Sequence, residues 1–257
     1  MADLVRYDCA EGVATLTLNR PERRNALSGD LVDAAIEALD RLDQDADAVA
    51  AVLTGEGKAF CSGGDLAGGM MGDGGVLEAR RSRGRFAELL AALHACGKPV
   101  VAGVNGDALG GGFGLMMACD LAVVAPTARL GTPEIRVGLF PHIILAELSR
   151  NVPRKRLLEM ILTGRHLSPD EALSWGLING VEDPALEGAH RLASSIARHS
   201  PAILRLGKAA FYDSAELEYA AALRYLREQL EANLLAEDAA EGITAFLQKR
   251  APEWRGR

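Results

Sequence analysis

Two glycine-rich segments decide the fold of this chain: residues 105–115, which read NGDALGGGFGL, and residues 59–66, which read AFCSGGDL. Each segment follows a short apolar run that is typical of a buried β-strand. Glycine tolerates backbone conformations that other residues avoid and lets a ligand approach the amide N–H closely. In residues 105–115 this donor is expected near a helix N-terminus, where an anion is favoured. Two converging donors would form an oxyanion hole, whereas the alternative that composition leaves open is a pair of tight, closely packed turns.

The glycine spacing excludes two common nucleotide-binding motifs. Residues 110–114 lack the Gly-x-Gly-x-x-Gly spacing of a dinucleotide fold. Residues 55–58, GEGK, lack both the earlier glycine and the following Ser or Thr of a phosphate-binding loop. The sequence also contains neither a Gly-x-Ser-x-Gly nucleophile elbow nor a His-Glu-x-x-His zinc motif.

Composition favours one substantial core, since the 257 residues are 49% hydrophobic and 25% charged. A net charge of −7 argues against nucleic-acid binding, which needs a basic face. The longest weakly charged stretch, residues 99–125, is interrupted by acids and glycines, so we expect no membrane span, and the N-terminal residues lack a signal-peptide pattern. We therefore expect a cytoplasmic protein. Widely spaced cysteines without a Cys-x-x-Cys pair indicate buried, reduced thiols and no metal site; they are Cys9, Cys61, Cys96 and Cys119.

The order of apolar patterns predicts an α/β protein with a helical C-terminal part. Strands are expected over residues 4–7, 13–18, 49–53, 99–104 and 121–125, and helices over residues 28–42, 77–93 and 115–118. From residue 153 onward the pattern is almost wholly helical, with helices expected over residues 154–162, 169–175, 185–198, 202–212, 215–235 and 238–249. We expect an α/β core over residues 1–195 and a helical region over residues 196–257, with no composition change to mark the boundary.

Residues 59–66 and 105–114 resemble the two oxyanion signatures of the crotonase, or enoyl-CoA hydratase/isomerase, superfamily. Residues 19–27, NRPERRNAL, resemble its N-terminal acyl-CoA-binding segment, and LTG at 162–164 with EAL at 171–173 resembles its later helix pair. The resemblance covers nearly the whole chain. It implies a spiral of ββα units with a helical C-terminal trimerisation region, assembled as a homotrimer or a dimer of trimers. It also implies an enzyme whose substrate is an acyl-CoA, with coenzyme A entering as part of the substrate and no separate cofactor.

The resemblance also implies a set of site residues. The backbone N–H groups of Gly64 and Gly111 would hold the thioester oxygen. Other positions would bind the substrate: Arg24, Ala26, Leu27, Ser62, Asp65, Leu66, Gly114, His142, Phe246 and Lys249. The last two belong to residues 246–250, which resemble a segment that often contacts coenzyme A from a neighbouring subunit. An amphipathic helix with a basic C-terminal end is an equally consistent interpretation of that segment.

The expected acid/base residue is Glu134, within residues 132–135, TPEI. Family hydratases usually carry a second glutamate, but Gly114 occupies that position here. Thr at an N-cap, Pro at the first helical position and an acid in the first turn would also explain Glu134 as an ordinary helix start. We hypothesise that Glu134 exchanges a proton with the α-carbon while the two N–H groups stabilise the enolate. One carboxylate suffices for double-bond isomerisation, whereas hydration normally needs a second group to position water.

Several alternatives stay open at this stage. His142 follows Glu134 in an apolar segment, and a lone histidine there is more often structural than catalytic. Asp107 and Asp73 are more typical of solvated loop acids. Residues 67–75 are expected to shape the acyl pocket. The rival functions are a decarboxylase or thioesterase with the same oxyanion hole, and a non-catalytic acyl-CoA binder.

Overall fold

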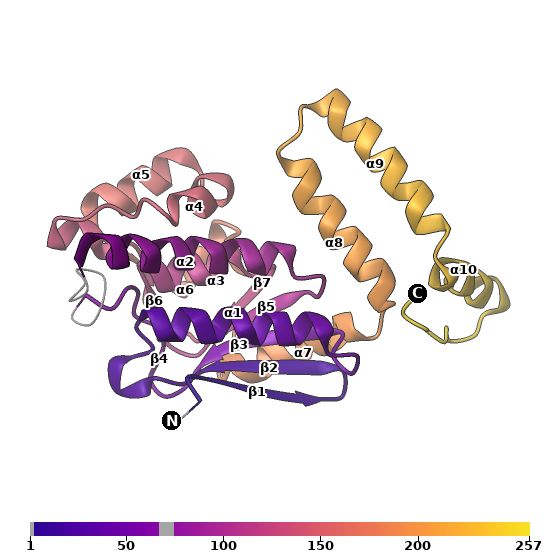
Figure 1. The fold of residues 1–257 in the computed structure, drawn as a ribbon, viewed down its shortest axis with the longest axis horizontal. Helices are drawn as coiled ribbons and strands as arrows, with labels where there is room; N and C mark the ends of the chain where they lie inside the picture. The colour runs from indigo at the N-terminus through magenta and orange to yellow at the C-terminus, as the bar shows by residue number, and fades with distance from the viewer. Residues whose placement is uncertain (1–2, 67–74) are drawn as a thin grey trace.

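The computed structural model describes residues 3–66 and 75–257, which fold into two β-sheets surrounded by helices (Figure 1). The larger sheet has the strand order β1-β2-β3-β5-β7-β10. Its first two strands are antiparallel and all its other pairs are parallel. Its strands are β1 (Val5–Ala10), β2 (Val13–Leu18), β3 (Ala50–Gly55), β5 (Val100–Val104), β7 (Leu121–Val124) and β10 (Gly180–Val181).

The smaller sheet has the order β4-β6-β8-β9, with only the last pair antiparallel. Its strands are β4 (Ala59–Cys61), β6 (Asp107–Leu109), β8 (Leu130–Gly131) and β9 (His166–Leu167). None of these was predicted as a strand from the residue pattern. Segments of two or three residues are too short to show the alternation of apolar and polar residues that identifies a strand. Their pairing depends on the fold around them.

From the second ββα unit on, each unit gives one strand to each sheet, which agrees with the expected spiral. β3 and β4 precede α2 (Gly75–Ala95), and β5 and β6 precede α3 (Gly111–Ala118). The first unit ends in α1 (Gly29–Gln44), where the Ser28 side chain accepts a hydrogen bond from the Leu31 N–H, as expected of an N-cap. The remaining elements before residue 198 are η1 (Pro21–Arg23), η2 (Pro133–Val137), α4 (Leu145–Asn151), α5 (Arg154–Thr163), α6 (Pro169–Ser174) and α7 (Ala185–Ala197).

Helices cover both faces of the larger sheet. On one face, α1, α2 and α3 pack over a core that includes Leu16 and Leu53 (Figure 1). On the other face, Ala189 of α7 packs with Val52 and Val101 in a separate apolar cluster. Successive residues of a strand point to opposite faces, so Val52 and Leu53 serve the two clusters. Apolar packing therefore supports the sheet on both faces, and the loops that follow its strands are attached to a packed core.

The C-terminal helices α8 (Pro201–Ala215), α9 (Tyr219–Leu234) and α10 (Glu237–Gln248) project from this core (Figure 1). The helix expected over residues 215–235 is α9, which begins four residues later than expected because α8 extends to Ala215. A partly buried ion pair ties α8 to the sheet: Lys208 Nζ lies 2.8 Å from Asp120 Oδ2. The division of the chain at residue 195 stays a prediction; that residue lies in the last turn of α7.

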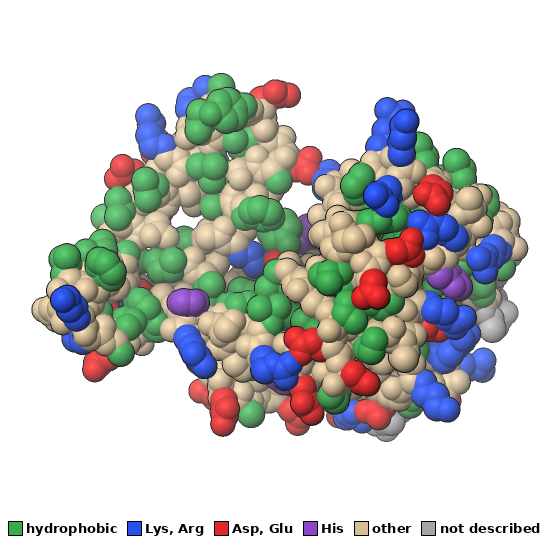
Figure 2. Space-filling model, turned by 180° about the vertical axis from the view of Figure 1, so that it is seen from behind, with side chains coloured by type: hydrophobic (Ala, Val, Ile, Leu, Met, Phe, Trp, Pro, Cys, Tyr) green, Lys and Arg blue, Asp and Glu red, His purple; other side chains and the backbone are tan. Residues whose placement is uncertain are grey.

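Large apolar side chains are exposed along the C-terminal helices, and Figure 2 shows hydrophobic groups on this part of the surface. They include Phe211, Tyr219, Leu223, Leu226, Leu230, Leu234, Leu235, Ile243, Phe246 and Leu247. This surface suits the expected trimer, which stays a prediction. Within residues 3–66 and 75–257, no helix is both long enough and apolar enough to span a membrane.

The cysteines differ from expectation at one position. Cys61, Cys96 and Cys119 are free and buried, as predicted, but the free thiol of Cys9 is exposed. Cys9 lies on β1, the edge strand of the larger sheet, whose residues are mostly exposed. The expectation of four buried thiols was therefore wrong for Cys9.

Candidate active site

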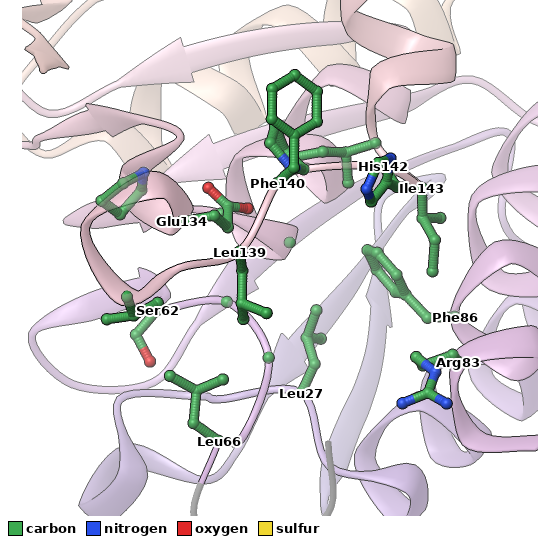
Figure 3. A pocket seen from close by; sticks show the side chains of 18 of the residues that line it. Leu27, Ser62, Leu66, Arg83, Phe86, Glu134, Leu139, Phe140, His142 and Ile143 are labelled. Atoms are coloured by element: carbon green, nitrogen blue, oxygen red, sulfur yellow. The ribbon is translucent and has the colours of Figure 1, made fainter. Parts of the chain in front are cut away.

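A cavity of about 520 Å³ lies where the two glycine-rich turns meet η2 and the loop before α4 (Figure 3). Most of its walls are apolar, and they are supplied by segments far apart in the sequence. The apolar groups include Leu27, Val32, Phe86, Leu139, Ile143 and Ile144. A concave, mostly apolar site with a few polar groups is the usual form of a small-molecule site.

The two glycine-rich turns converge at the edge of this cavity. Gly63 has φ +95° and Gly110 has φ +55°, conformations that favour glycine. A Cβ atom built on Gly63 would lie 3.3 Å from the Gly111 nitrogen. A Cβ atom built on Gly111 would lie 3.6 Å from the Gly64 nitrogen. Side chains at these positions would fill the space beside the two amide groups, so glycine keeps that space open.

The hydrogen bonding of each turn directs these amide groups away from the protein scaffold. Leu27 pairs with Gly64 in a parallel bridge, in which the Leu27 N–H donates to Gly63 O at 2.8 Å and the Asp65 N–H donates to Leu27 O at 3.1 Å. In such a bridge the N–H of Gly64 itself points away from Leu27. Gly111 is the first residue of α3, so its N–H has no acceptor within the helix. Both N–H groups are therefore placed to donate to a ligand.

Glu134 lies beside the second turn, on the 3₁₀ helix η2. Its Oε1 would lie 3.0 Å from a Cβ atom on Gly110, and its Oε2 is buried without a hydrogen-bond partner among the described residues. Burial raises the pKa of the Glu134 carboxyl group, because the charged form loses hydration. Of the described residues that line the cavity, Glu134 is the single carboxylate. A buried carboxyl group with a shifted pKa in a cavity is a candidate for a functional residue.

The helix-start interpretation of Glu134 is only partly met. Pro133 is the first residue of η2, but the Thr132 side chain makes no capping hydrogen bond. Its Oγ1 is buried and lacks a hydrogen-bond partner in the described part of the chain. Thr132 therefore stands at the N-cap position with Glu134 in the first turn, as expected, but its side chain does not cap the helix.

Gly114 lies one helical turn into α3, behind Ile144. A Cβ atom on Gly114 would lie 2.0 Å from Ile144 Cγ2 and 2.6 Å from Ile144 Cβ. Ile144 is 2% exposed and lines the cavity, whereas Gly114 does not line it. The space that a second acidic side chain would need is thus occupied by an apolar one.

The other predicted binding residues fall into three groups. Leu27, Ser62, Leu66 and His142 line the cavity together with Gly64, Gly111 and Glu134, and the His142 ring lies 5.2 Å from that of Phe140.

Three predicted residues lie behind the first turn and do not line the cavity. Asp65 is 6% exposed and forms an ion pair with Arg20 at 2.6 Å. Ala26 is buried, and Arg24 O accepts a hydrogen bond from the Ser62 N–H at 3.0 Å. These contacts support the turn that carries Gly64. Direct contact of Arg24, Ala26 or Asp65 with coenzyme A stays a prediction.

Phe246 and Lys249 lie at the end of α10, far from the cavity of the same chain. In Figure 1, α10 stands at one end of the molecule and β4 and β6 at the other. Phe246 is 82% exposed, and Lys249 has a left-handed conformation that ends the helix. Their role toward substrate stays a prediction that requires a neighbouring subunit.

Three of the cavity residues that the sequence interpretation missed are Arg83, Phe86 and Ile144. Arg83 and Phe86 lie three positions apart on α2 and so share one face of the helix. That spacing was visible in the sequence, although nothing near it marked a site. Ile144 gave no signal, because its contact with Gly114 joins positions thirty residues apart along the chain.

Comparison with known proteins agrees with this fold. The family model for enoyl-CoA hydratase/isomerase matches residues 8–257. The chain is 38% identical to 2,3-dehydroadipyl-CoA hydratase of Escherichia coli over 95% of this chain and 96% of that one. An enoyl-CoA hydratase structure from Mycobacterium smegmatis superposes with a TM-score of 0.91 at 37% identity, covering 98% of both chains. One from Bacillus anthracis gives 0.93 at 30% identity, covering 99% and 100%. The chain therefore belongs to the enoyl-CoA hydratase/isomerase family of acyl-CoA enzymes.

Proposed function

We propose that the protein isomerises the double bond of an enoyl-CoA, with Glu134 as the single acid/base. The observation that carries this proposal is the buried, unpartnered Oε2 of Glu134 beside two converging backbone donors. The cavity at this point is apolar, which suits an acyl chain.

The N–H groups of Gly64 and Gly111 would hold the thioester oxygen. Removal of a proton from the α-carbon places negative charge on that oxygen, and two fixed donors stabilise the enolate more than the neutral thioester. One such donor is typically worth about 3 to 4 kcal/mol in the transition state. The position of Gly111 at the start of α3 adds the positive end of a helix dipole.

Glu134 would then carry one proton between two carbons. In a 3-enoyl-CoA, the carboxylate takes a proton from the α-carbon, and the β,γ double-bond electrons and the new electron pair delocalise as a dienolate. The protonated Glu134 returns the proton to the γ-carbon, which leaves the double bond between the α- and β-carbons. The carboxylate is restored and no further reactant is consumed. A raised pKa suits both halves of this transfer.

The contact between Gly114 and Ile144 favours isomerisation over hydration. Hydration asks for a second polar group to position water, and Ile144 fills the space where a side chain on Gly114 would stand. Hydration is the second candidate, because the related proteins from E. coli and M. smegmatis are named hydratases. A decarboxylase, a thioesterase and a non-catalytic binder use the same oxygen-binding geometry and are separated by experiment.

The test is mass-resolved product analysis with matched 2-enoyl-CoA and 3-enoyl-CoA. Isomerisation predicts a shifted alkene of unchanged mass from the 3-enoyl substrate. A water adduct from the 2-enoyl substrate would instead establish hydration. Retained affinity for both thioesters with no product from either would support the binder, and release of free coenzyme A would identify a thioesterase.

A further inference from the structure

The described lining of the cavity carries more positive than negative side chains, unlike the chain as a whole. The whole chain has a net charge of −7, yet the described lining residues include Arg83 and Arg136 against the one carboxylate of Glu134. Positive groups at the border of an apolar cavity favour a ligand that brings negative charge to them, because electrostatic complementarity sets specificity.

The two arginines differ in where their side chains pack. Arg136 lies against the turn after α5: its Cγ and Nε would lie 3.2 and 3.3 Å from a Cβ atom on Gly164. Arg83 projects from α2 at the end of the cavity, beside Phe86 (Figure 3). Arg83 is therefore the better placed of the two to meet a ligand inside the cavity.

Phe86 connects the glycine turn to Arg83. A Cβ atom on Gly111 would lie 3.5 Å from Phe86 Cζ, so the aromatic ring reaches the proposed thioester site. Arg83 precedes Phe86 by three residues, which is about 4.5 Å along a helix axis and on the same face. A ligand chain that starts at Gly111 and runs along the Phe86 ring would bring its far end toward Arg83.

The opposite side of the cavity is where coenzyme A is expected. Figure 3 shows Ser62 and Leu66 on one side and Arg83 on the other, with Leu27 between them. We infer that the acyl group carries a carboxylate at its far end and that Arg83 binds it. This inference rests on the proposed function, since it takes the thioester carbonyl to lie at Gly64 and Gly111.

The chemistry of the guanidinium group suits this role. It carries five N–H donors in a planar fork that matches a carboxylate with two parallel hydrogen bonds. Five donors allow a guanidinium group that already has a protein partner to bind a ligand carboxylate as well. Arg83 is exposed, so water competes with the ligand, and the expected preference for a terminal carboxylate is about tenfold in affinity.

The experiment is calorimetric titration with saturated acyl-CoAs, which bind without turnover. Adipyl-CoA is compared with hexanoyl-CoA and with the methyl ester of adipyl-CoA, which keeps the length but removes the charge. Wild type is expected to bind adipyl-CoA about tenfold more tightly than either neutral ligand. Arg83→Met should abolish this preference, and Arg83→Lys should keep part of it. Arg81→Met is the matched control, because Arg81 is an exposed arginine on α2 that does not line the cavity.

Three results would overturn the inference. Equal affinity of wild type for all three ligands would show that no terminal carboxylate is recognised. If Arg83→Met weakened the binding of all three acyl-CoAs equally, Arg83 would bind the phosphates of coenzyme A instead of a terminal carboxylate. Absence of binding by every acyl-CoA would contradict the proposed function, and the inference would fall with it. Circular dichroism of each variant checks that its fold is intact.

Discussion

Ile144 occupies the space beside Gly114: its Cγ2 lies 2.0 Å from where a Cβ atom on Gly114 would stand. Gly114 belongs to a helix and has no left-handed conformation to maintain, so space alone requires glycine there. The resemblance predicted a missing carboxylate at this position. The structure adds the reason why a carboxylate cannot simply be restored.

Gly114→Ala is expected to destabilise the protein by about 1 to 3 kcal/mol, because the new methyl group would overpack a full core. Ile144→Ala alone should also destabilise it, since it removes a buried side chain. The double variant should be more stable than the sum of the two changes predicts, because the methyl group added at position 114 fills part of the space that Ile144→Ala leaves. Urea denaturation of the four proteins measures this coupling, and strictly additive changes would contradict the contact.

Glu134→Gln should abolish turnover while leaving the cavity intact, because glutamine keeps the shape of the side chain but cannot take a proton. The expected loss in kcat is about 10²- to 10⁴-fold, with little change in acyl-CoA affinity. Rates and affinities are measured with the same thioester. A variant that loses affinity as much as rate would show that Glu134 binds substrate and does not move the proton.

The pH dependence of wild type should follow the raised pKa of Glu134. The base must be ionised to take the proton, so kcat/KM rises with pH through the carboxyl pKa of the free enzyme and then levels. Burial places that pKa above the ordinary glutamate value of about 4.3. A profile that has already levelled at the ordinary value would contradict the buried environment.

The same burial has a consequence for stability. The folded protein holds the Glu134 proton more tightly than the unfolded chain does, so the free energy of unfolding falls as pH rises from the ordinary carboxyl pKa to the raised one. Glu134→Gln removes this penalty. The variant should therefore gain Tm relative to wild type near neutral pH, and that gain should shrink below the ordinary pKa. If the difference in Tm between Glu134→Gln and wild type were the same at every pH, its cause would be packing and not the ionisation of Glu134.

Lys208 holds α8 onto the sheet. Its Nζ lies 2.8 Å from Asp120 Oδ2 and also donates to the carbonyl oxygens of Leu93 and Lys98. Lys208→Met should cost about 3 to 5 kcal/mol, because it leaves a largely buried carboxylate without its cation. Lys208→Met/Asp120→Asn should recover part of that loss. Thermal unfolding checks both variants, and a Tm within error of wild type for Lys208→Met would show that the pair does not anchor α8.

The C-terminal helices are expected to assemble. α9 has no buried residue in the single chain, yet Tyr219, Leu223, Leu226 and Leu230 share one stripe along it. Leu223→Lys should lower the mass seen by sedimentation velocity, whereas Glu228→Lys on the same helix should not. A wild-type protein that sediments as a monomer would remove the basis of the expected trimer.

The sequence allowed the larger elements to be predicted because their patterns are local. Ser28 and the apolar spacing after it predicted α1, and the resemblance led to Glu134 and to the two glycine turns. The smaller sheet could not be predicted from its residues, because strands such as β8 (Leu130–Gly131) contain two residues. Ile144 and Arg83 line a cavity that is built from distant parts of the chain, so their positions could be found only from the fold. Residues 67–75 were expected to shape the acyl pocket, and residues 67–74 of that segment lie outside the described residues.

The most direct test of proton transfer by Glu134 is the rate at which a 3-enoyl-CoA becomes the 2-enoyl isomer, measured for wild type and for Glu134→Gln. The account predicts a product of unchanged mass from wild type and a rate at least about 100-fold lower in the variant. An unchanged rate in Glu134→Gln would contradict it.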